Sequence, residues 1–325
     1  MEFHPSFDEF REKAKQGNLI PVHTKVMADT TTPIAAFRTL PSGYYSFLLE
    51  SAETKERFGR YSFFASHPGH PKFVFTSWGL HYTIQRVGTN AIVQSGGMTE
   101  DPLDELKRFL SRYTFVPDAD LPPFQGGAVG YIGYNVACDY KRVSRTTHVS
   151  LALPDCLFMI YERFFIYDHV KRQILAVALA NVKGDDAAVA YERALKAIEQ
   201  QVQYLKCTVK GSRRKNASRT NTASSDDEGK FEEAALLAKN ACTETPSVEQ
   251  VYLSKRFSRE TGAHPLDVYR ALRAGSPSPY MYFLKFKGDC LIGASQHPLI
   301  TIKNGPQGQT AFDAVRDALP SPAIT

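Results

Sequence analysis

Short runs of β-branched and aromatic residues, separated by turn residues, recur along the chain and are typical of antiparallel strands. They lie at residues 44–49, 60–65, 72–76, 80–87, 280–286 and 290–293. Helical patterns stand between groups of these runs rather than after every run, so the regular alternation of a doubly wound parallel sheet is missing. The sequence therefore predicts an α+β fold in which antiparallel sheets pack with helices.

Three amphipathic helices are expected among these strands. The first begins at Pro102, because Asp101 offers an N-cap and proline suits the first helical position. The second follows an apolar stripe through residues 187–205. The third covers residues 265–274 and stops at Gly275.

Two further segments predict strands in the middle of the chain. Residues 157–168, followed by 173–179, predict a hairpin with its turn at Asp168-His169. The glycine-rich segment 126–130 is the nearest approach to a phosphate-binding loop, but a strand pattern rather than a helix follows it. Close backbone packing is therefore the preferred interpretation of these glycines. The motifs of P-loop proteins, zinc hydrolases and serine hydrolases are absent from the sequence.

A polar stretch divides the chain. Residues 210–229 contain no aromatic and no large apolar residue, so a solvated linker or surface insertion is expected there. A nuclear signal or a contact with an anionic surface is the alternative for its basic half. A helix at 231–240 and a strand at 250–257 are expected beyond it. The predicted organisation is a first domain, a flexible polar linker and a second domain, at residues 1–206, 207–247 and 248–325.

Charge, cysteines and hydropathy exclude several classes of protein. The 325 residues include 39 Lys and Arg against 34 Asp and Glu, and part of this excess lies in the polar linker, so no nucleic-acid partner is indicated. The five cysteines never form a Cys-x-x-Cys spacing, which indicates reduced thiols and no zinc site. The longest apolar run, 174–180, is far shorter than the ~20 residues of a membrane span, and the N-terminus lacks a signal-peptide pattern. We therefore expect a cytoplasmic protein with no membrane partner.

Two segments far apart in the sequence carry groups that suit an amino-acid ligand. Glu50 and Ser51 place a carboxylate and a hydroxyl at a strand end, which suits an ammonium group. Residues 276–281 begin another strand with two prolines, and this stiff turn with the Tyr280 ring suits an apolar side chain. A strand end and a strand start explain the same residues without any ligand.

These segments, together with others in the same order, resemble anthranilate synthase component I. The motifs are Leu-Leu-Glu-Ser at 48–51, Gly-Arg-Tyr-Ser-Phe at 59–63, Gly-Gly-Ala-Val-Gly-Tyr at 126–131, Leu-Pro-Asp at 153–155 with Asp-His at 168–169, Arg-Phe-Ser at 256–258, and Asp-Val-Tyr-Arg-Ala-Leu-Arg at 267–273 running into Pro-Ser-Pro-Tyr-Met at 277–281. They extend over most of residues 21–302 apart from the linker.

The resemblance implies an enzyme of tryptophan biosynthesis that, with Mg²⁺, converts chorismate and ammonia to anthranilate and pyruvate. It implies a glutamine amidotransferase partner that supplies the ammonia. It also implies feedback inhibition by L-tryptophan bound between the two segments, with Glu50 at the ammonium group and the Pro-Tyr-Met turn at the indole. The implied effector contacts are Glu50, Ser51, Pro279, Tyr280 and Met281.

The resemblance also implies a catalytic lobe of which this chain holds only an incomplete start. The family's Gly-Thr-Arg segment, its Asp-Leu-Gly-Arg-Asn-Asp run, its Gly-Thr-Val-Ser-Gly-Ala-Pro-Lys loop and the glutamates that hold Mg²⁺ are missing from the sequence. Residues 311–320 resemble the helix before that loop, and our hypothesis is an internal deletion followed by early termination. His297 is more simply interpreted as a surface histidine than as a replacement base. We expect no catalytic residues, no metal ligands and no anthranilate from this chain alone.

Several alternatives stay open at this point. In one alternative, the chain is a non-catalytic tryptophan-binding regulatory subunit. In another, it is one half of a split enzyme whose catalytic lobe is a separate chain. Aminodeoxychorismate synthase and isochorismate synthase are relatives in the same superfamily, and their distinguishing residues lie mostly in the missing lobe. The Leu-Leu-Glu-Ser and Pro-Ser-Pro-Tyr-Met pair favours the anthranilate branch.

Overall fold

A computed structural model describes residues 1–52, 59–66, 71–97, 101–133, 136, 153–184, 186–206 and 260–296. Residues 1–210 and 268–325 form one compact unit, and residues 211–267 form a second. The helices of the described parts are α1 (Phe7–Lys13), α2 (Pro33–Thr39), α3 (Pro102–Leu110), α5 (Ala187–Lys206) and α7 (Pro265–Gly275). None of the helices within these ranges has the length and apolar character needed to cross a membrane.

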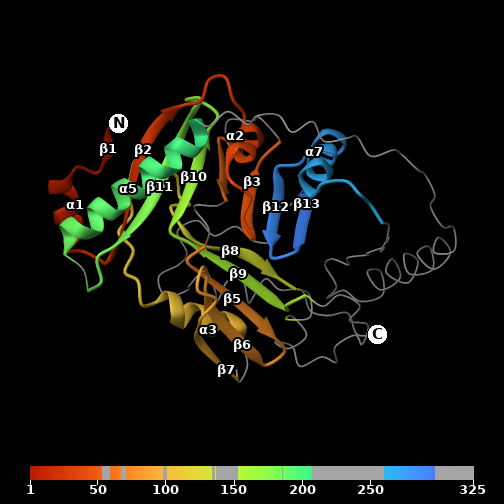
Figure 1. Cartoon of the computed structure of the whole chain (residues 1–325), viewed down its shortest axis with the longest axis horizontal. Helices are drawn as coiled ribbons and strands as arrows, with labels where there is room; N and C mark the ends of the chain where they lie inside the picture. Colours follow the sequence, from red (N-terminus) through yellow and green to blue (C-terminus); the bar gives the residue numbers. More distant parts are fainter. Residues whose placement is uncertain are drawn as a thin grey trace, which may run out of the picture. The chain divides into compact units, whose positions relative to one another are not determined.

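The described strands form two antiparallel sheets (Figure 1). The strands of the larger sheet, in spatial order, are β1 (Phe3–His4), β2 (Leu19–Met27), β11 (Gln173–Asn181), β10 (Arg163–Asp168), β4 (Tyr61–Ala65), β3 (Tyr45–Glu50), β12 (Tyr280–Phe286) and β13 (Asp289–Ser295). Those of the smaller sheet are β7 (Ile92–Gly97), β6 (His81–Arg86), β5 (Phe73–Trp78), β9 (Cys156–Tyr161) and β8 (Gly127–Ile132). The predicted α+β class with antiparallel sheets is confirmed.

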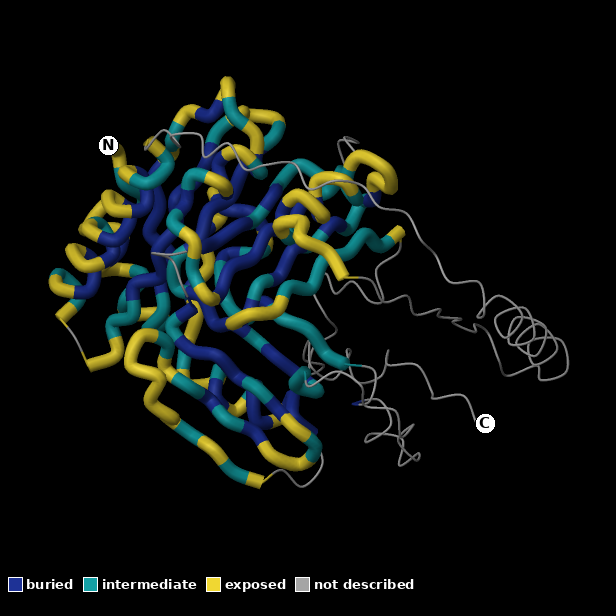
Figure 2. Tube along the Cα trace, turned by 45° about the vertical axis from the view of Figure 1, so that its right-hand side comes forward, coloured by how far each residue is buried: buried dark blue, intermediate teal, exposed yellow. Residues whose placement is uncertain are grey.

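The larger sheet is covered on both faces. Helix α5 lies across β2 and β11 on one face, and α2 packs beside it on β3 and β4 (Figure 1). There Phe37 of α2 meets the rings of Phe64 and Phe283 edge-on, at centroid distances of 6.4 and 5.8 Å. The opposite face packs against the smaller sheet, where the rings of Phe47 and Tyr161 lie 4.8 Å apart. The central strands are accordingly the most deeply buried part of the fold (Figure 2).

The predicted hairpin at residues 157–179 is confirmed at its turn and wrong in its first strand. β10 and β11 pair from Arg163 opposite Ala178 to Asp168 opposite Gln173. Residues 157–168, however, divide at Glu162, since β9 belongs to the smaller sheet and β10 to the larger. Both strands are almost wholly buried, so a continuous apolar pattern indicates strand without indicating which sheet it joins.

The three predicted helices are confirmed as α3, α5 and α7, and the structure adds the short helices α1 and α2. The predictions at residues 210–229, 231–240 and 250–257 lie outside the described residues. β12 and β13 extend the larger sheet, and residues 268–296 belong to the same unit as residues 1–210. The domain boundary at residue 248 stays a prediction.

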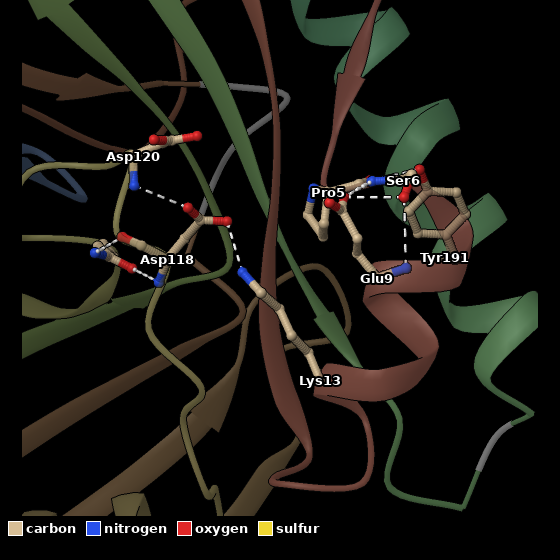
Figure 3. Close-up of polar contacts among 8 residues, drawn as sticks. Pro5, Ser6, Glu9, Lys13, Asp118, Asp120 and Tyr191 are labelled. Carbon is tan, nitrogen blue, oxygen red and sulfur yellow. Dashed lines mark hydrogen bonds and ion pairs between the residues drawn. The ribbon is translucent and has the colours of Figure 1, made fainter.

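Helix α1 is fixed at its N-terminus by a capping box. The Ser6 hydroxyl accepts a hydrogen bond from the Glu9 backbone N–H, and Glu9 Oε2 accepts one from the Ser6 backbone N–H at 2.9 Å (Figure 3). The Tyr191 hydroxyl of α5 donates to the carbonyl of Pro5 at 2.8 Å. These bonds attach the first residues of the chain to the helical layer.

We expect Lys13→Met to lower the free energy of unfolding by about 1 kcal/mol. Lys13 Nζ donates to Asp118 Oδ2 at 2.8 Å, and the Asp118 side chain is only 9% exposed (Figure 3). The substitution leaves this carboxylate with fewer donors. The matched control is Lys15→Met, because Lys15 and Glu12 are 66% and 61% exposed, and it should cost less than ~0.5 kcal/mol. Equal costs for the two variants in urea denaturation would contradict the prediction.

Candidate functional site

The two segments that suit an amino-acid ligand lie side by side in the structure. β3 and β12 lie side by side and pair antiparallel (Figure 1). Glu50 stands directly opposite Met281 in this pairing. Just beyond β3, the backbone N–H of Ala52 donates to the carbonyl of Ser278 at 2.9 Å. The ends of the Leu-Leu-Glu-Ser and Pro-Ser-Pro-Tyr-Met motifs therefore form one continuous strip of the larger sheet.

The carboxylate of Glu50 is completely enclosed, with a side-chain exposure of 0%. The Tyr269 hydroxyl of α7 donates to its Oε1 atom at 2.6 Å. Arg273 Nε lies 2.8 Å from the same oxygen, an ion-pair contact whose N–H is not aligned for a hydrogen bond. Among the described residues no group donates to Oε2. Because buried carboxylate oxygens ordinarily have a partner, Oε2 is the atom of this cluster that retains capacity for a ligand.

The electrostatics of the cluster depend on burial and on the two groups from α7. Burial raises the pKa of the Glu50 carboxyl, and the Tyr269 hydrogen bond and the Arg273 charge oppose this shift only in part. Burial also raises the pKa of Tyr269, and the neighbouring carboxylate adds to the effect. Tyr269 is therefore a hydroxyl donor throughout the ordinary pH range, and Glu50 accepts a proton more readily than an exposed glutamate.

The proline-rich turn is held by the hydroxyl of Ser278. This buried hydroxyl donates to the backbone carbonyl of the last residue of β13 and accepts a hydrogen bond from the Tyr280 N–H, the latter at 3.0 Å. Met281 is buried beside Glu50, whereas Ser51, Pro279 and Tyr280 are half-buried. Since side chains alternate along a strand, Tyr280 and Met281 face opposite sides of the sheet. The structure thus brings all five predicted residues to one place but divides them between two faces.

A second polar cluster joins two other predicted motifs. Arg60 Nε and Nη2 donate to the two carboxylate oxygens of Asp168 at 3.3 and 3.0 Å, and Ser62 Oγ lies 2.8 Å from His169 Nε2. Burial alone would raise the pKa of Asp168, but the Arg60 bond and two backbone N–H groups outweigh it and lower that pKa. These contacts tie β4 to the β10–β11 turn, so the Gly-Arg-Tyr-Ser-Phe and Asp-His motifs stabilise the sheet.

The glycine-rich segment before Tyr131 packs closely against backbone at Gly130, as its sequence predicts, whereas Gly126 lies against the Leu179 side chain. It forms the start of β8, and a Cβ placed at Gly130 would lie 1.8 Å from the carbonyl oxygen of Leu157. Gly130 therefore serves the close approach of β8 to β9.

Sequence reasoning missed the two α7 residues that hold Glu50. Tyr269 and Arg273 stand four positions apart, which places both side chains on one face of a helix. That spacing inside Asp-Val-Tyr-Arg-Ala-Leu-Arg was the available signal. It does not reveal the partner, because Glu50 lies more than 200 positions earlier in the chain.

Metal-binding groups are a separate question. In the ranges that the structure describes, no cluster of three or more His, Cys, Asp or Glu side chains could hold a metal ion. These ranges therefore contain no donor set that fits Mg²⁺. His297 lies outside them. Cys156 and Cys290, the cysteines within them, are free thiols, and burial raises the pKa of Cys156 to about 12.

The sequence profile of the chorismate binding enzymes matches residues 60–312. The chain belongs to this family. Anthranilate synthase component 1 of Acetivibrio thermocellus is 32% identical over 93% of the chain, and that of Aquifex aeolicus is 31% identical over 94%. The crystal structure of anthranilate synthase component I from Streptococcus pneumoniae TIGR4 aligns with 86% of the chain at a TM-score of 0.58 and 26% identity.

This chorismate binding enzyme homologue spans about three-fifths of the length of the relatives that it matches. It covers 61% of the A. thermocellus and A. aeolicus proteins and 59% of the S. pneumoniae chain. The resemblance to anthranilate synthase component I is confirmed.

Proposed function

We propose that this chain is the tryptophan-binding portion of an anthranilate synthase component I. The observation that carries the proposal is the antiparallel pairing that sets Glu50 opposite Met281, because it joins the two motifs that suit an amino acid. Membership of the chorismate-binding family and the similarity to component I proteins support it. So does a buried carboxylate with one oxygen left for a donor.

In this proposal each part of tryptophan meets matching chemistry. The ammonium group donates to Glu50 Oε2, forming a charge-assisted hydrogen bond. The indole ring packs on Met281, which lies opposite Glu50, and on the turn at Pro279. Tyr280 faces the other side of the sheet and supports this turn through its backbone N–H, which donates to Ser278 Oγ. The Ser51 hydroxyl meets the polar end of the ligand. Because Oε2 is enclosed in the ligand-free chain, a neighbouring side chain has to move before the ligand reaches it.

The full reaction is assigned to a larger assembly than this chain. Conversion of chorismate and ammonia to anthranilate and pyruvate, the Mg²⁺ site and the contact with a glutamine amidotransferase belong, in this proposal, to the remaining two-fifths of the family's length and to its partner. Residues 1–206 then correspond to the N-terminal domain of component I, 207–247 to a linker, and 248–325 to the start of the chorismate-binding lobe.

Calorimetric titration with L-tryptophan tests the effector site. Glu50→Gln should weaken binding tenfold to a hundredfold, on the order of the loss expected for a hydrogen bond to a charged group. The matched control is Glu105→Gln on α3, because that glutamate is also nearly buried, pairs through one oxygen with Arg108 at 2.5 Å, and keeps an unpartnered Oε2 within the described residues. The control should bind as the wild type does. Equal affinities for the wild type and Glu50→Gln would contradict the proposed site.

An anthranilate fluorescence assay on the same preparation tests the catalytic part. With chorismate, Mg²⁺ and ammonium, the purified chain should form no product, because acid–base groups and metal must all be placed around the substrate. Anthranilate formation at a rate above the buffer blank would refute the assignment of catalysis to the larger assembly. It would leave the tryptophan result unaffected.

A further inference from the structure

Two side chains of helix α7 contact a single carboxylate oxygen. The Tyr269 hydroxyl and Arg273 Nε both lie within 2.8 Å of Glu50 Oε1. A carboxylate has about four acceptor directions over two oxygens, and here the Tyr269 hydrogen bond and the Arg273 ion-pair contact both fall on Oε1. The effect is to fix the plane of the carboxylate and to leave Oε2 without a donor among the described residues.

The position of Tyr269 makes this arrangement rigid. Tyr269 is 0% exposed, and its ring meets Phe283 of β12 at a centroid distance of 6.0 Å, edge-on. Phe283 in turn packs against Phe37 of α2. Rotation of the Tyr269 ring would therefore disturb the apolar packing of two helices on the sheet. The hydroxyl is held at one point, and with it the orientation of Glu50.

A buried ion pair that only attaches α7 to the sheet would show the same contacts. Such pairs contribute little net stability, because desolvation offsets the attraction between the charges. The two roles differ in one respect. A purely structural pair affects every ligand of the site equally, whereas a group that keeps Oε2 charged and correctly oriented affects only ligands that carry an ammonium group.

We propose that Tyr269 and Arg273 are positioning residues that make the site selective for ligands with a charged primary ammonium group. They occupy Oε1, hold Oε2 toward the ligand and favour the ionised form of Glu50. This inference rests on the proposed tryptophan site and assigns its selectivity to two residues of α7. The class of ligand that it predicts is a free amino acid, as opposed to an indole acid or an N-acylated amino acid.

The experiment is calorimetry with two ligands on matched variants. L-tryptophan is compared with indole-3-propionate, which has the ring and the carboxylate but no ammonium group. Tyr269→Phe should weaken tryptophan binding about tenfold and leave indole-3-propionate binding unchanged, because the lost bond goes to the charged form of Glu50. Tyr191→Phe is the control, since it also removes one buried tyrosine hydrogen bond, to the Pro5 carbonyl at 2.8 Å. It should change neither affinity.

The pH profile supplies a second readout, which does not depend on Tyr269→Phe folding. In Arg273→Gln, whose side chain is 39% exposed in the wild type, loss of the cation raises the pKa of Glu50 further. The pH at which tryptophan binding is half lost on acidification should therefore move upward relative to wild type. An unchanged midpoint would show that Arg273 does not favour the ionised form of Glu50.

The outcomes separate the two proposals. If the wild-type chain does not bind tryptophan, the proposed function and this inference are both overturned. If wild type binds tryptophan but Tyr269→Phe weakens both ligands equally, or Arg273→Gln leaves the pH midpoint unchanged, the positioning role alone is overturned. A loss of discrimination in Tyr269→Phe together with the raised midpoint in Arg273→Gln supports it.

Discussion

Gly130→Ala is expected to lower the free energy of unfolding by about 3 kcal/mol or more, because the new methyl group meets backbone rather than a mobile side chain. Its Cβ would lie 1.8 Å from the carbonyl oxygen of Leu157 and 2.7 Å from Phe158 Cα. Gly130 stands opposite Phe158 in the β8–β9 ladder. No rotamer change relieves such a contact, so the two strands must separate and stretch their hydrogen bonds.

Urea denaturation of Gly130→Ala beside Gly97→Ala checks this expectation. Gly97 also lies in a strand of the smaller sheet, but the nearest atom to its Cβ position is the Leu80 carbonyl oxygen at 3.9 Å, an ordinary contact. Gly97→Ala should therefore change the free energy of unfolding by less than ~0.5 kcal/mol. A Gly130→Ala midpoint as high as that of the control would contradict the expected clash between β8 and β9.

Acidification from pH 6.5 to pH 4 is expected to cost the fold about 3 kcal/mol through His23 alone. Burial lowers the pKa of His23 from its ordinary 6.5 to about 4; the nearby Asp118 carboxylate opposes the shift, and the His4 and Lys25 side chains add to it. The imidazole is 0% exposed, and neither ring nitrogen has a hydrogen-bond partner in the described parts of the chain. The unfolded chain binds this proton more readily than the folded chain does. The contribution of neutral His23 to the free energy of unfolding is therefore fully present above pH 6.5 and is lost as the pH falls toward 4.

His23→Leu should remove this component of the pH dependence. The variant replaces an unpartnered polar ring by an apolar side chain. Between pH 6.5 and 4, the slope of its free energy of unfolding against pH should therefore be smaller than that of the wild type, by the equivalent of about one bound proton. His81→Gln, at an exposed strand position, is the control and should keep the wild-type slope. The paired carboxylates Asp118 and Asp168 act at lower pH, because their pKa values lie below 3.8 in the folded chain. Parallel curves for His23→Leu and wild type would rule out the assignment.

Local signals predicted most of the secondary structure. The Asp101-Pro102 pair marks the start of α3, where the Asp101 side chain accepts from the Leu103 N–H at 2.7 Å. The apolar stripe of α5 matches its buried face. These features depend on residues within one or two helical turns of each other, so they can be recognised in the sequence without knowledge of the fold. The seven-residue helices α1 and α2 were missed, because so short a segment gives too few positions for a periodic pattern.

Long-range pairing could be predicted only through the resemblance. The strand pattern at 157–168 contains no sign of the change of sheet at Glu162, because both strands are buried on both faces. Likewise, strand runs at 44–49 and 280–286 indicate two strands without indicating that they are neighbours. Residues far apart in sequence meet through packing of the whole core, for which a single sequence carries no local mark.

For the site, the amino-acid sequence was sufficient to select Glu50 and Met281, since the motifs that contain them resemble those of a known family. The tertiary structure decided the surroundings of Glu50. It enclosed the carboxylate, set Tyr269 and Arg273 against one of its oxygens and left the other without a donor in the described residues. The reason is physical. The sequence determines the type of each side chain, but the protonation state and orientation of a buried carboxylate depend on the groups that the fold brings around it.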